Sequence, residues 1–533
     1  MKSIVMGGIV ALSLGLSGCV VTETAEPSAA ELANTTVPEA SPDEGVLEIV
    51  HPVEPVEFEV AEPIEVEPEI EPNLWQHAAN QFTFEIPDNK RVTAQKNWYL
   101  RHPSYMRRVS KRASPFLYHI VEQIEQHDMP MEFVLLPIVE SAFDPFAYSH
   151  GSAAGMWQFI EGTGKRFGLK QTWWYDGRRD AIASTEAAMK YLAYLHKFFD
   201  GNWLHALAAY NSGEGRVRNA IRKNKRLGKP TDFWSLSLPR ETRAYVPKLL
   251  ALADILKNKD QYDFAWPVIN NTPAIDIIDI GGQIDLALAA DIAGMSVKEL
   301  SALNPGYNRW ATDPDGPHQL VLPLDKAGAF QTELAKLDDS ERLNWERHHI
   351  RSGDSLIKIA KQYHTTVDVI RQVNGIRGNS IRAGDYMLVP VALKALDTYV
   401  LSNDQRLASL QNRSRKGHQI THTVSHGDTL WDLSRKYDVS TRTLAKWNGM
   451  APGDTLRPGK KLVVWLEEGN SNLTTVTRKL TYTVRRGDSL SRIASKFKVR
   501  VSQLKQWNSL ENQKYLQPGQ KLTVIVDVAE VAS

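Results

Sequence analysis

One glutamate, Glu140, stands near the end of the apolar segment 133–143, Phe-Val-Leu-Leu-Pro-Ile-Val-Glu-Ser-Ala-Phe. Its carboxyl is the only charged side chain of that segment, and charged side chains avoid such surroundings unless they are paired or functional. Partial removal from water raises the pKa of a carboxyl group, which keeps it protonated near neutral pH and able to donate a proton. Glu140 is therefore a candidate general acid, and a carboxylate at the edge of a buried helix is the structural alternative.

A second segment, 151–159, reads Gly-Ser-Ala-Ala-Gly-Met-Trp-Gln-Phe and approaches an apolar stretch through small residues. Because glycine lets a backbone pass close to a ligand, Gly155 suits such an approach. Gln158 supplies the only side-chain amide of the segment, which can bind a hydroxyl or an amide of a ligand. We therefore expect this segment to form part of a polar binding site.

Two predicted helix ends add further polar groups. Residues 208–215 end a helix with Tyr210 and Asn211 before a glycine-rich turn, and residues 239–246 open another helix that carries Tyr245. Each has a structural explanation as well, since asparagine often ends helices and tyrosine often packs in a core. Taken one at a time, these residues do not identify a reaction.

In this order, the segments resemble the lysozyme-like lytic transglycosylases of glycoside hydrolase family 23. The resemblance rests on four motifs, Glu140-Ser141, Gly155 to Gln158, Ala209 to Asn211, and Tyr245. One departure is Met156-Trp157, where many members have Leu-Met. The resemblance implies that Glu140 is catalytic and that the substrate is bound by Ser141, Gly155, Met156, Gln158, Tyr210, Asn211 and Tyr245.

The activity that this family implies needs a single carboxyl group. Glu140 would protonate the oxygen between N-acetylmuramic acid and N-acetylglucosamine in peptidoglycan, and then remove a proton from the muramoyl 6-hydroxyl to close a 1,6-anhydro ring. Ordinary glycosidases use two carboxylates, and the nearest second candidate, Asp144, precedes Pro145 and fits a turn better. Two alternatives stay open, a hydrolytic muramidase of the same fold and a non-catalytic lipoprotein that binds the cell wall.

Elements that position these motifs are expected to be helices. Apolar residues recur at helical spacing in 115–127, 185–199, 203–210 and 241–256, and few alternating strand patterns occur. The sequence therefore predicts an all-α, lysozyme-like catalytic domain over residues 74–266.

The C-terminal half contains three repeats of about 45 residues. Each has a short strand and a Gly-Asp turn, and an asparagine follows 21 residues after that glycine, at Asn374, Asn448 and Asn508. The predicted order of strand, two helices and strand resembles the LysM module, a small α+β fold that binds glycans containing N-acetylglucosamine. We place three modules at residues 346–391, 421–466 and 480–526.

The connecting region 267–345 is less regular. Within it, residues 284–323 have a similar rhythm but lack the Gly-Asp turn, which predicts a degenerate LysM-like unit. The whole chain is thus expected to be multidomain, with the all-α domain followed by small βααβ modules.

The N-terminus predicts a lipid anchor. Lys2 precedes an apolar run that is too short to span a bilayer, and Leu-Ser-Gly then leads to Cys19, the only cysteine. This pattern resembles the bacterial lipoprotein box, which implies a signal peptide over 1–18 and a lipidated Cys19 that holds the chain to a membrane. Val20 in the next position favours the outer membrane by the same resemblance, and hence the periplasm. An ordinary signal peptide with an incidental cysteine is the alternative.

The segment 19–73 is expected to be an extended tether. Residues 20–72 hold 15 Asp plus Glu and eight Pro, a composition that repels itself and buries little. The chain as a whole has a net charge of +1 and gives no nucleic-acid signal. With one cysteine and only an isolated His348-His349 pair, the sequence predicts no metal site and no cofactor.

Overall fold

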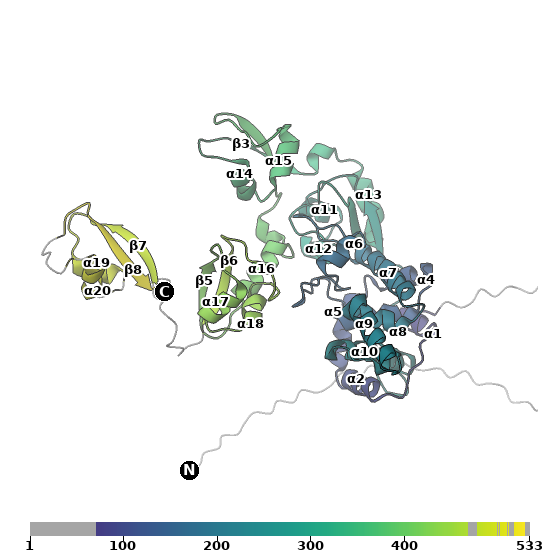
Figure 1. Ribbon diagram of the computed structural model, residues 1–533. Coiled ribbons are helices and arrows are strands. Elements are labelled where there is room, and N and C mark those ends of the chain that lie inside the picture. The colour runs from purple at the N-terminus through teal and green to yellow at the C-terminus, as the bar shows by residue number, and fades with distance from the viewer. Residues whose placement is uncertain are drawn as a thin grey trace, which may run out of the picture. The chain divides into compact units, whose positions relative to one another are not determined.

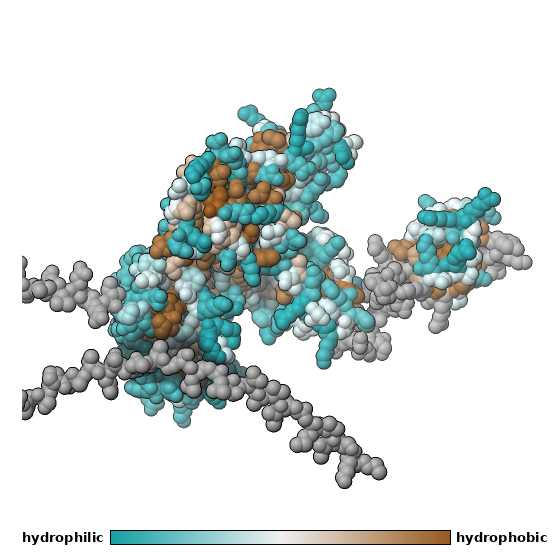
Figure 2. All heavy atoms as spheres, turned by 180° about the vertical axis from the view of Figure 1, so that it is seen from behind, coloured by the Kyte–Doolittle hydropathy of each residue, from teal (hydrophilic) through white to brown (hydrophobic). Residues whose placement is uncertain are grey.

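The structure is a computed structural model that describes residues 71–466 and 477–527, except 498, 500, 509 and 511–515 (Figure 1). The predicted signal peptide, Cys19 and nearly all of the tether lie outside the described residues. None of the described helices combines the length and apolar character that crossing a membrane requires. The face of the protein seen in Figure 2 is mainly hydrophilic, with hydrophobic patches between the polar side chains.

Residues 71–274 form helices and turns, with no β-strand longer than an isolated bridge. This confirms the all-α class predicted for the part of the chain that carries the four motifs. Its elements are α1 (Leu74–Asn80), α2 (Lys90–Leu100), α3 (Pro103–Ala113), α4 (Leu117–Gln126), η1 (Met131–Leu135), α5 (Leu136–Ser141), α6 (Glu161–Arg166), α7 (Ala181–Phe198), α8 (Trp203–Ser212), α9 (Glu214–Arg226), η2 (Phe233–Ser235) and α10 (Arg240–Lys257).

Helix α10 is the central element of this helical domain. Twelve of its 18 residues are buried, and it packs against α1, α2, α5 and α8. A helix that is apolar around most of its circumference belongs inside a domain. Because α10 also contacts α5 and α8, it can bring Tyr245 close to the residues that those two short helices carry.

The next unit has the order strand, helix, helix, strand. It comprises β1 (Ile275–Asp279), α11 (Leu286–Ile292), α12 (Val297–Leu303) and β2 (Gln319–Pro323), followed by α13 (Leu324–Leu334) and η3 (Asp339–Glu341). Strands β1 and β2 are antiparallel, with Ile275 opposite Pro323 and Asp279 opposite Gln319. The βααβ order is therefore present here although the Gly-Asp turn is missing.

Aromatic residues of the helical domain complete the core of this βααβ unit. Trp174 and Tyr175 are buried together with apolar residues of β1, α11, α12 and β2. The backbone N–H of Asn308 donates to the carbonyl of Trp174 at 2.7 Å, and that of Asp176 donates to the carbonyl of Gly306 at 2.8 Å. The aromatic segment 173–175 thus packs in the core of the βααβ unit.

Three further two-stranded units follow, and they confirm the predicted small α+β modules. Each pairs its first and last strand in antiparallel fashion around two short helices. They are β3 (Asn344–His349), α14 (Leu356–Gln362), α15 (Val367–Asn374) and β4 (Tyr386–Val391); β5 (His418–Thr423), α17 (Leu430–Lys436), α18 (Thr441–Trp447) and β6 (Lys461–Leu466); and β7 (Thr477–Thr483), α19 (Leu490–Lys496), α20 (Val501–Trp507) and β8 (Lys521–Asp527), with η4 (Leu396–Thr398) and α16 (Asn403–Asn412) between the first and second.

One asparagine ties the second helix to the last strand in every unit. In the second module the side-chain amide of Asn448 donates to the carbonyls of Leu444 and Val463, while its oxygen accepts from the N–H of Val463 at 2.7 Å. The same three bonds, which we call the asparagine bridge, are formed by Asn374 and Asn508. They are also formed by Asn304, so the unit without a Gly-Asp turn keeps this feature of the modules.

Candidate active site

A cleft of about 640 Å³ lies on the helical domain and is lined from α5, α7, α8, α10 and the segment 149–163. It brings together five of the eight site residues expected from the sequence, although they are spread over more than 100 positions in the chain. These five are Glu140, Gln158, Tyr210, Asn211 and Tyr245.

Helix α5 is short, and its end fixes the position of Glu140. Pro137 stands in its first turn, where a missing N–H is harmless. The helix stops at Ser141 because Ala142 and Phe143 both take left-handed backbone angles, with φ of 56° and 55°. Left-handed residues end a helix abruptly. Glu140 therefore occupies the last turn of α5, half-buried and at the cleft surface.

The electrostatic surroundings of Glu140 favour its protonated form. Burial raises the pKa of its carboxyl to about 7, and the charge of Glu241 adds to this effect. The hydroxyl of Tyr245 donates to Oε1 of Glu140 at 2.6 Å. This hydrogen bond and the charge of Lys248 both lower the pKa and so offset part of the increase. The result is a carboxyl group that can both donate and accept a proton near neutral pH.

The other three cleft residues present polar groups from two sides. Tyr210 on α8 donates its hydroxyl to the carbonyl of Trp157 at 2.9 Å, which ties α8 to the segment that carries Gln158. Gln158 has a left-handed φ of 51° and donates its amide to the carbonyl of Gly155 at 2.7 Å. Asn211 lies at the cleft in the last turn of α8.

The remaining three predicted residues, Ser141, Gly155 and Met156, do not line the cleft. Met156 is fully buried, and its carbonyl accepts a hydrogen bond from the Ser141 hydroxyl at 2.9 Å. Gly155 has a φ of +82°, and a Cβ atom there would lie 1.7 Å from the carbonyl oxygen of Arg178. In the structure these residues hold the loop against α5, and their expected contacts with substrate stay a prediction.

Charged residues that the motifs did not indicate also line the cleft, namely Glu214, Glu241 and Lys248. Two of them stand on α10, Glu241 four residues before Tyr245 and Lys248 three residues after it. Residues three and four apart share one face of a helix. Helical periodicity around Tyr245 could therefore have indicated both positions.

Asp144 is absent from the residues that line the cleft. Its carboxylate accepts from the backbone N–H of Phe146 at 3.0 Å and forms an ion pair with Arg112 at 3.3 Å. These contacts are those of a turn residue. Among the described residues, no group of three or more His, Cys, Asp or Glu side chains is arranged to hold a metal ion.

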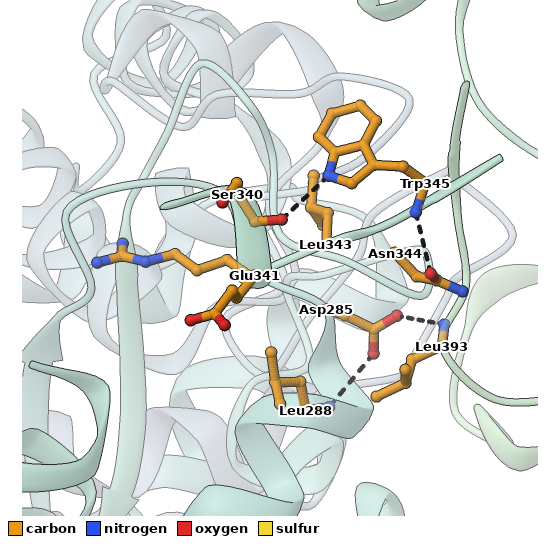
Figure 3. A pocket seen from close by; sticks show the side chains of 9 residues that line it. Asp285, Leu288, Ser340, Glu341, Leu343, Asn344, Trp345 and Leu393 are labelled. Carbon is orange, nitrogen blue, oxygen red and sulfur yellow. Dashed lines mark hydrogen bonds between the residues drawn. The ribbon is translucent and has the colours of Figure 1, made fainter. Parts of the chain in front are cut away.

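A second hollow, of about 370 Å³, lies beside α11 (Figure 3). The buried carboxylate of Asp285 in its lining is already fully used by the protein. It accepts from the Tyr399 hydroxyl at 2.9 and 3.0 Å and from the backbone N–H of Leu393 at 2.9 Å. Trp345, at the same hollow, donates its indole N–H to the carbonyl of Ser340. We therefore assign this site to the packing of the chain that follows the first module.

Comparisons with known proteins agree with the division of the chain seen in the structure. The transglycosylase SLT domain family matches residues 118–233, and the family described as "Lytic transglycosylase MltD, LysM-like domain" matches 274–339. The LysM domain family matches residues 348–390, 422–465 and 482–524.

Curated relatives extend the similarity over most of the chain. Membrane-bound lytic murein transglycosylase D of Escherichia coli K12 is 39% identical over 408 residues, which are 75% of this chain and 86% of that protein. A putative tributyltin chloride resistance protein of an Alteromonas species is 40% identical over 182 residues, 34% of this chain and 85% of its own length. Among solved structures, an inactive mutant of the lytic transglycosylase Slt from Pseudomonas aeruginosa is similar, at 25% identity and a TM-score of 0.24, over 35% of this chain and 32% of that one.

Proposed function

Because this chain belongs to the family of membrane-bound lytic murein transglycosylase D, we propose that Glu140 is the acid and then the base of its reaction. The protein is a peptidoglycan lytic transglycosylase. It cleaves the β-1,4 bond between N-acetylmuramic acid and N-acetylglucosamine without water and leaves 1,6-anhydro ends. The observation that carries the assignment is the position of Glu140 in the cleft, bonded to Tyr245 at 2.6 Å, where burial raises the pKa of its carboxyl to about 7 and gives one residue access to both protonation states.

The reaction has two proton transfers. In the first, the Glu140 carboxyl gives its proton to the glycosidic oxygen, the bond from that oxygen to C1 of the muramoyl sugar breaks, and the N-acetylglucosamine part leaves with a free hydroxyl. The acetamide of the muramoyl sugar stabilises the positive charge left at C1. In the second, ionised Glu140 takes the proton of the 6-hydroxyl while its oxygen bonds to C1, so the carboxyl ends the cycle protonated.

Tyr245 supports the ionised state between these two steps. Its hydroxyl donates to Oε1 of Glu140 at 2.6 Å, and hydrogen bonds to charged acceptors are stronger than those between neutral groups. The amides of Gln158 and Asn211 and the hydroxyl of Tyr210 present polar groups in the same cleft, where we assign them to the sugar hydroxyls and acetamides. Ser141, Gly155 and Met156 act indirectly, by holding the loop that carries Gln158.

The LysM modules bind the same polymer. When one module is bound, it raises the local concentration of glycan around the other two. Three weak binding sites on one chain therefore hold the enzyme tightly on peptidoglycan. The enzyme therefore acts while attached to its substrate in the cell envelope.

We further propose that the chain is anchored through lipidated Cys19 in the outer membrane and faces the periplasm. The support is the Leu16-Ser17-Gly18-Cys19 sequence, with Val20 after it, and the similarity to a relative described as membrane-bound. Incorporation of a labelled fatty acid into the wild type, and its loss in Cys19→Ser, is the expected result. Wild-type protein found unlabelled, or labelled but in inner-membrane fractions, would contradict this assignment.

Purified sacculi provide the test of Glu140. Wild-type protein is expected to release fragments with anhydro ends, each one water lighter than a reducing end, as measured by mass spectrometry. Glu140→Gln is expected to release none while still sedimenting with sacculi through its LysM modules. A variant that cuts normally would refute the role of Glu140, and release of nothing by the wild type would favour a non-catalytic wall-binding protein.

Hydrolysis is the second candidate, because Glu241 supplies a further carboxylate in the cleft. The same digestion in water enriched in oxygen-18 separates the two reactions. A hydrolase incorporates the label at a reducing end, whereas the transglycosylase reaction consumes no water and leaves the anhydro product unlabelled.

A further inference from the structure

The cleft that contains Glu140 is rich in acidic groups and has a single strongly basic one. Glu140, Glu214 and Glu241 line it, and Lys248 is the only lysine or arginine among the described residues that do so. Because the glycan backbone of the substrate is uncharged, such a cation has no partner in the sugar rings themselves. A partner for it on the substrate would therefore be an anionic group outside the sugar rings.

Lys248 faces the same space as the reacting groups. It follows Tyr245 by three residues on α10, and such pairs share one helix face. The hydroxyl of Tyr245 is bonded to Glu140, and the positive charge of Lys248 acts on the same carboxyl by lowering its pKa. The ammonium group is therefore close enough to Glu140 to contact substrate bound over that residue.

Nothing in the described part of the protein pairs with this lysine. Lys248 is half-buried, yet its ammonium forms no ion pair and no hydrogen bond with any described residue. Lys96 on α2, which also contacts α10, shows the usual alternative, since its ammonium binds the Asp254 carboxylate at 2.8 Å. Withdrawing an ammonium group from water without a partner is unfavourable. An anionic group on the ligand would supply that partner.

We propose that Lys248 binds a carboxylate of the substrate strand. This rests on the proposed function and names the group that the cleft recognises. Only the muramoyl sugar carries a lactyl substituent, which ends in a carboxylate when bare and leads to the carboxylates of a stem peptide when substituted. The alternating N-acetylglucosamine has neither, so Lys248 distinguishes the two sugars and sets the strand in the register that presents the correct bond to Glu140.

Binding also couples recognition to chemistry. A substrate carboxylate neutralises the ammonium of Lys248 and so removes its attraction for ionised Glu140. The pKa of Glu140 is then higher in the complex than in the free enzyme. Its carboxyl therefore stays protonated in the complex, where the first step needs the proton. The anion of the substrate thus helps to prepare the acid that cleaves it.

The test compares the full-length variants Lys248→Met and Lys248→Arg with a control, Lys257→Met, in which an exposed lysine of the same helix is replaced. Substrates are soluble, uncrosslinked glycan strands in three forms: with stem peptides, stripped of peptides by an amidase, and with all carboxylates converted to amides by carbodiimide chemistry. The release of anhydro ends is measured over time to obtain kcat and KM for each combination of variant and substrate.

Lys248→Met is expected to raise KM about tenfold on strands that carry carboxylates, as for the loss of one charge-assisted contact, with a smaller change in kcat. On amidated strands it should match the wild type, and Lys248→Arg should restore most of the affinity. An effect on stripped strands assigns the lactyl carboxylate, and an effect confined to peptide-bearing strands assigns the stem peptide.

An unchanged KM on both anionic substrates would overturn the proposal, as would an equal loss on amidated strands. Thermal unfolding of each variant identifies a change caused by misfolding. Glu140→Gln abolishes cleavage of all three substrates whether or not Lys248 binds a carboxylate. Failure of this inference, with wild-type anhydro products still formed, is therefore distinct from failure of the proposed function.

Discussion

The Glu140→Gln variant is expected to unfold at a higher temperature than the wild-type protein, by an amount that depends on pH. Glu140 has a pKa of about 7 in the folded protein, against an ordinary value of 4.5. Below pH 4.5 the carboxyl is protonated in both the folded and the unfolded chain and has no effect. Between these values the unfolded chain loses its proton first, so the free energy of unfolding falls as pH rises.

The size of the effect follows from the difference of about 2.5 pKa units. At about 1.36 kcal/mol per unit, the wild-type protein loses about 3 kcal/mol of stability between pH 4.5 and 7 through this single group. Glutamine is neutral at every pH and nearly the same shape, so the variant escapes that loss. For a domain of this size, the expected gain in melting temperature above pH 7 is on the order of 10 °C.

Differential scanning calorimetry of full-length protein at pH 4 and pH 8 measures this. The helical domain of Glu140→Gln should melt close to the wild type at pH 4 and several degrees higher at pH 8. Other buried carboxyls, such as Glu132, titrate in both proteins and cancel in the comparison. Glu186→Gln, which alters an exposed carboxylate paired with Lys190 on α7, is the control and should change neither melting temperature noticeably.

An equal gain at both pH values would refute the reasoning, because the stabilisation would then come from packing and not from ionisation. A loss of stability at pH 8 would refute it more directly, since it would mean that the folded protein prefers the charged carboxylate. Either result would also remove the basis for treating Glu140 as an acid that is protonated near neutral pH.

Three further predictions concern single side chains. Tyr245→Phe removes a hydrogen bond that lowers the pKa of Glu140. The alkaline limb of the pH profile of kcat/KM should therefore move to higher pH by about one to two units. An alkaline limb at the wild-type pH would contradict this. Asn448→Ala leaves two strand groups without partners and should destabilise the second module by about 1–3 kcal/mol, seen in calorimetry, with cleavage of soluble strands unchanged. Gly155→Ala meets the carbonyl of Arg178 at 1.7 Å and should lower the melting temperature of the helical domain sharply; a variant that melts normally would show that the loop can yield.

Sequence patterns predicted the architecture well because both kinds of unit depend on local order. The helical domain follows from apolar spacing, and the modules follow from repeated turns and an asparagine at constant spacing. The reason for that asparagine could not be read in advance, because its oxygen and amide bind a strand that is 14 or 15 residues away in the chain. That Asn304 forms the same bridge in the unit without a Gly-Asp turn emerged only from the paired strands.

Glu140 could be singled out as a candidate acid because its apolar surroundings are local in the sequence. Motif matching could not separate residues that line the cleft from residues that hold the loop in place, since both kinds are needed for one site. Met156 and Gly155 are expected to bind substrate, which stays a prediction, whereas the side chains that line the cleft include Lys248 and Glu241, which belong to none of the four motifs. Helical spacing places Glu241 and Lys248 on the same face as Tyr245, but the position of that face at the cleft depends on the packing of α10 against α5, a tertiary contact.

The contribution of Trp174 and Tyr175 to the core of the following βααβ unit determines where this chain can be cut for study. A fragment that stops at residue 266 would expose both rings, because the apolar partners that bury them come from β1 to β2. Exposed aromatic clusters of this kind promote aggregation. The helical domain and the βααβ unit are accordingly expected to unfold in one cooperative transition. The shortest catalytic fragment that stays soluble should therefore extend through α13. The second LysM module has a core of its own and is expected to unfold separately.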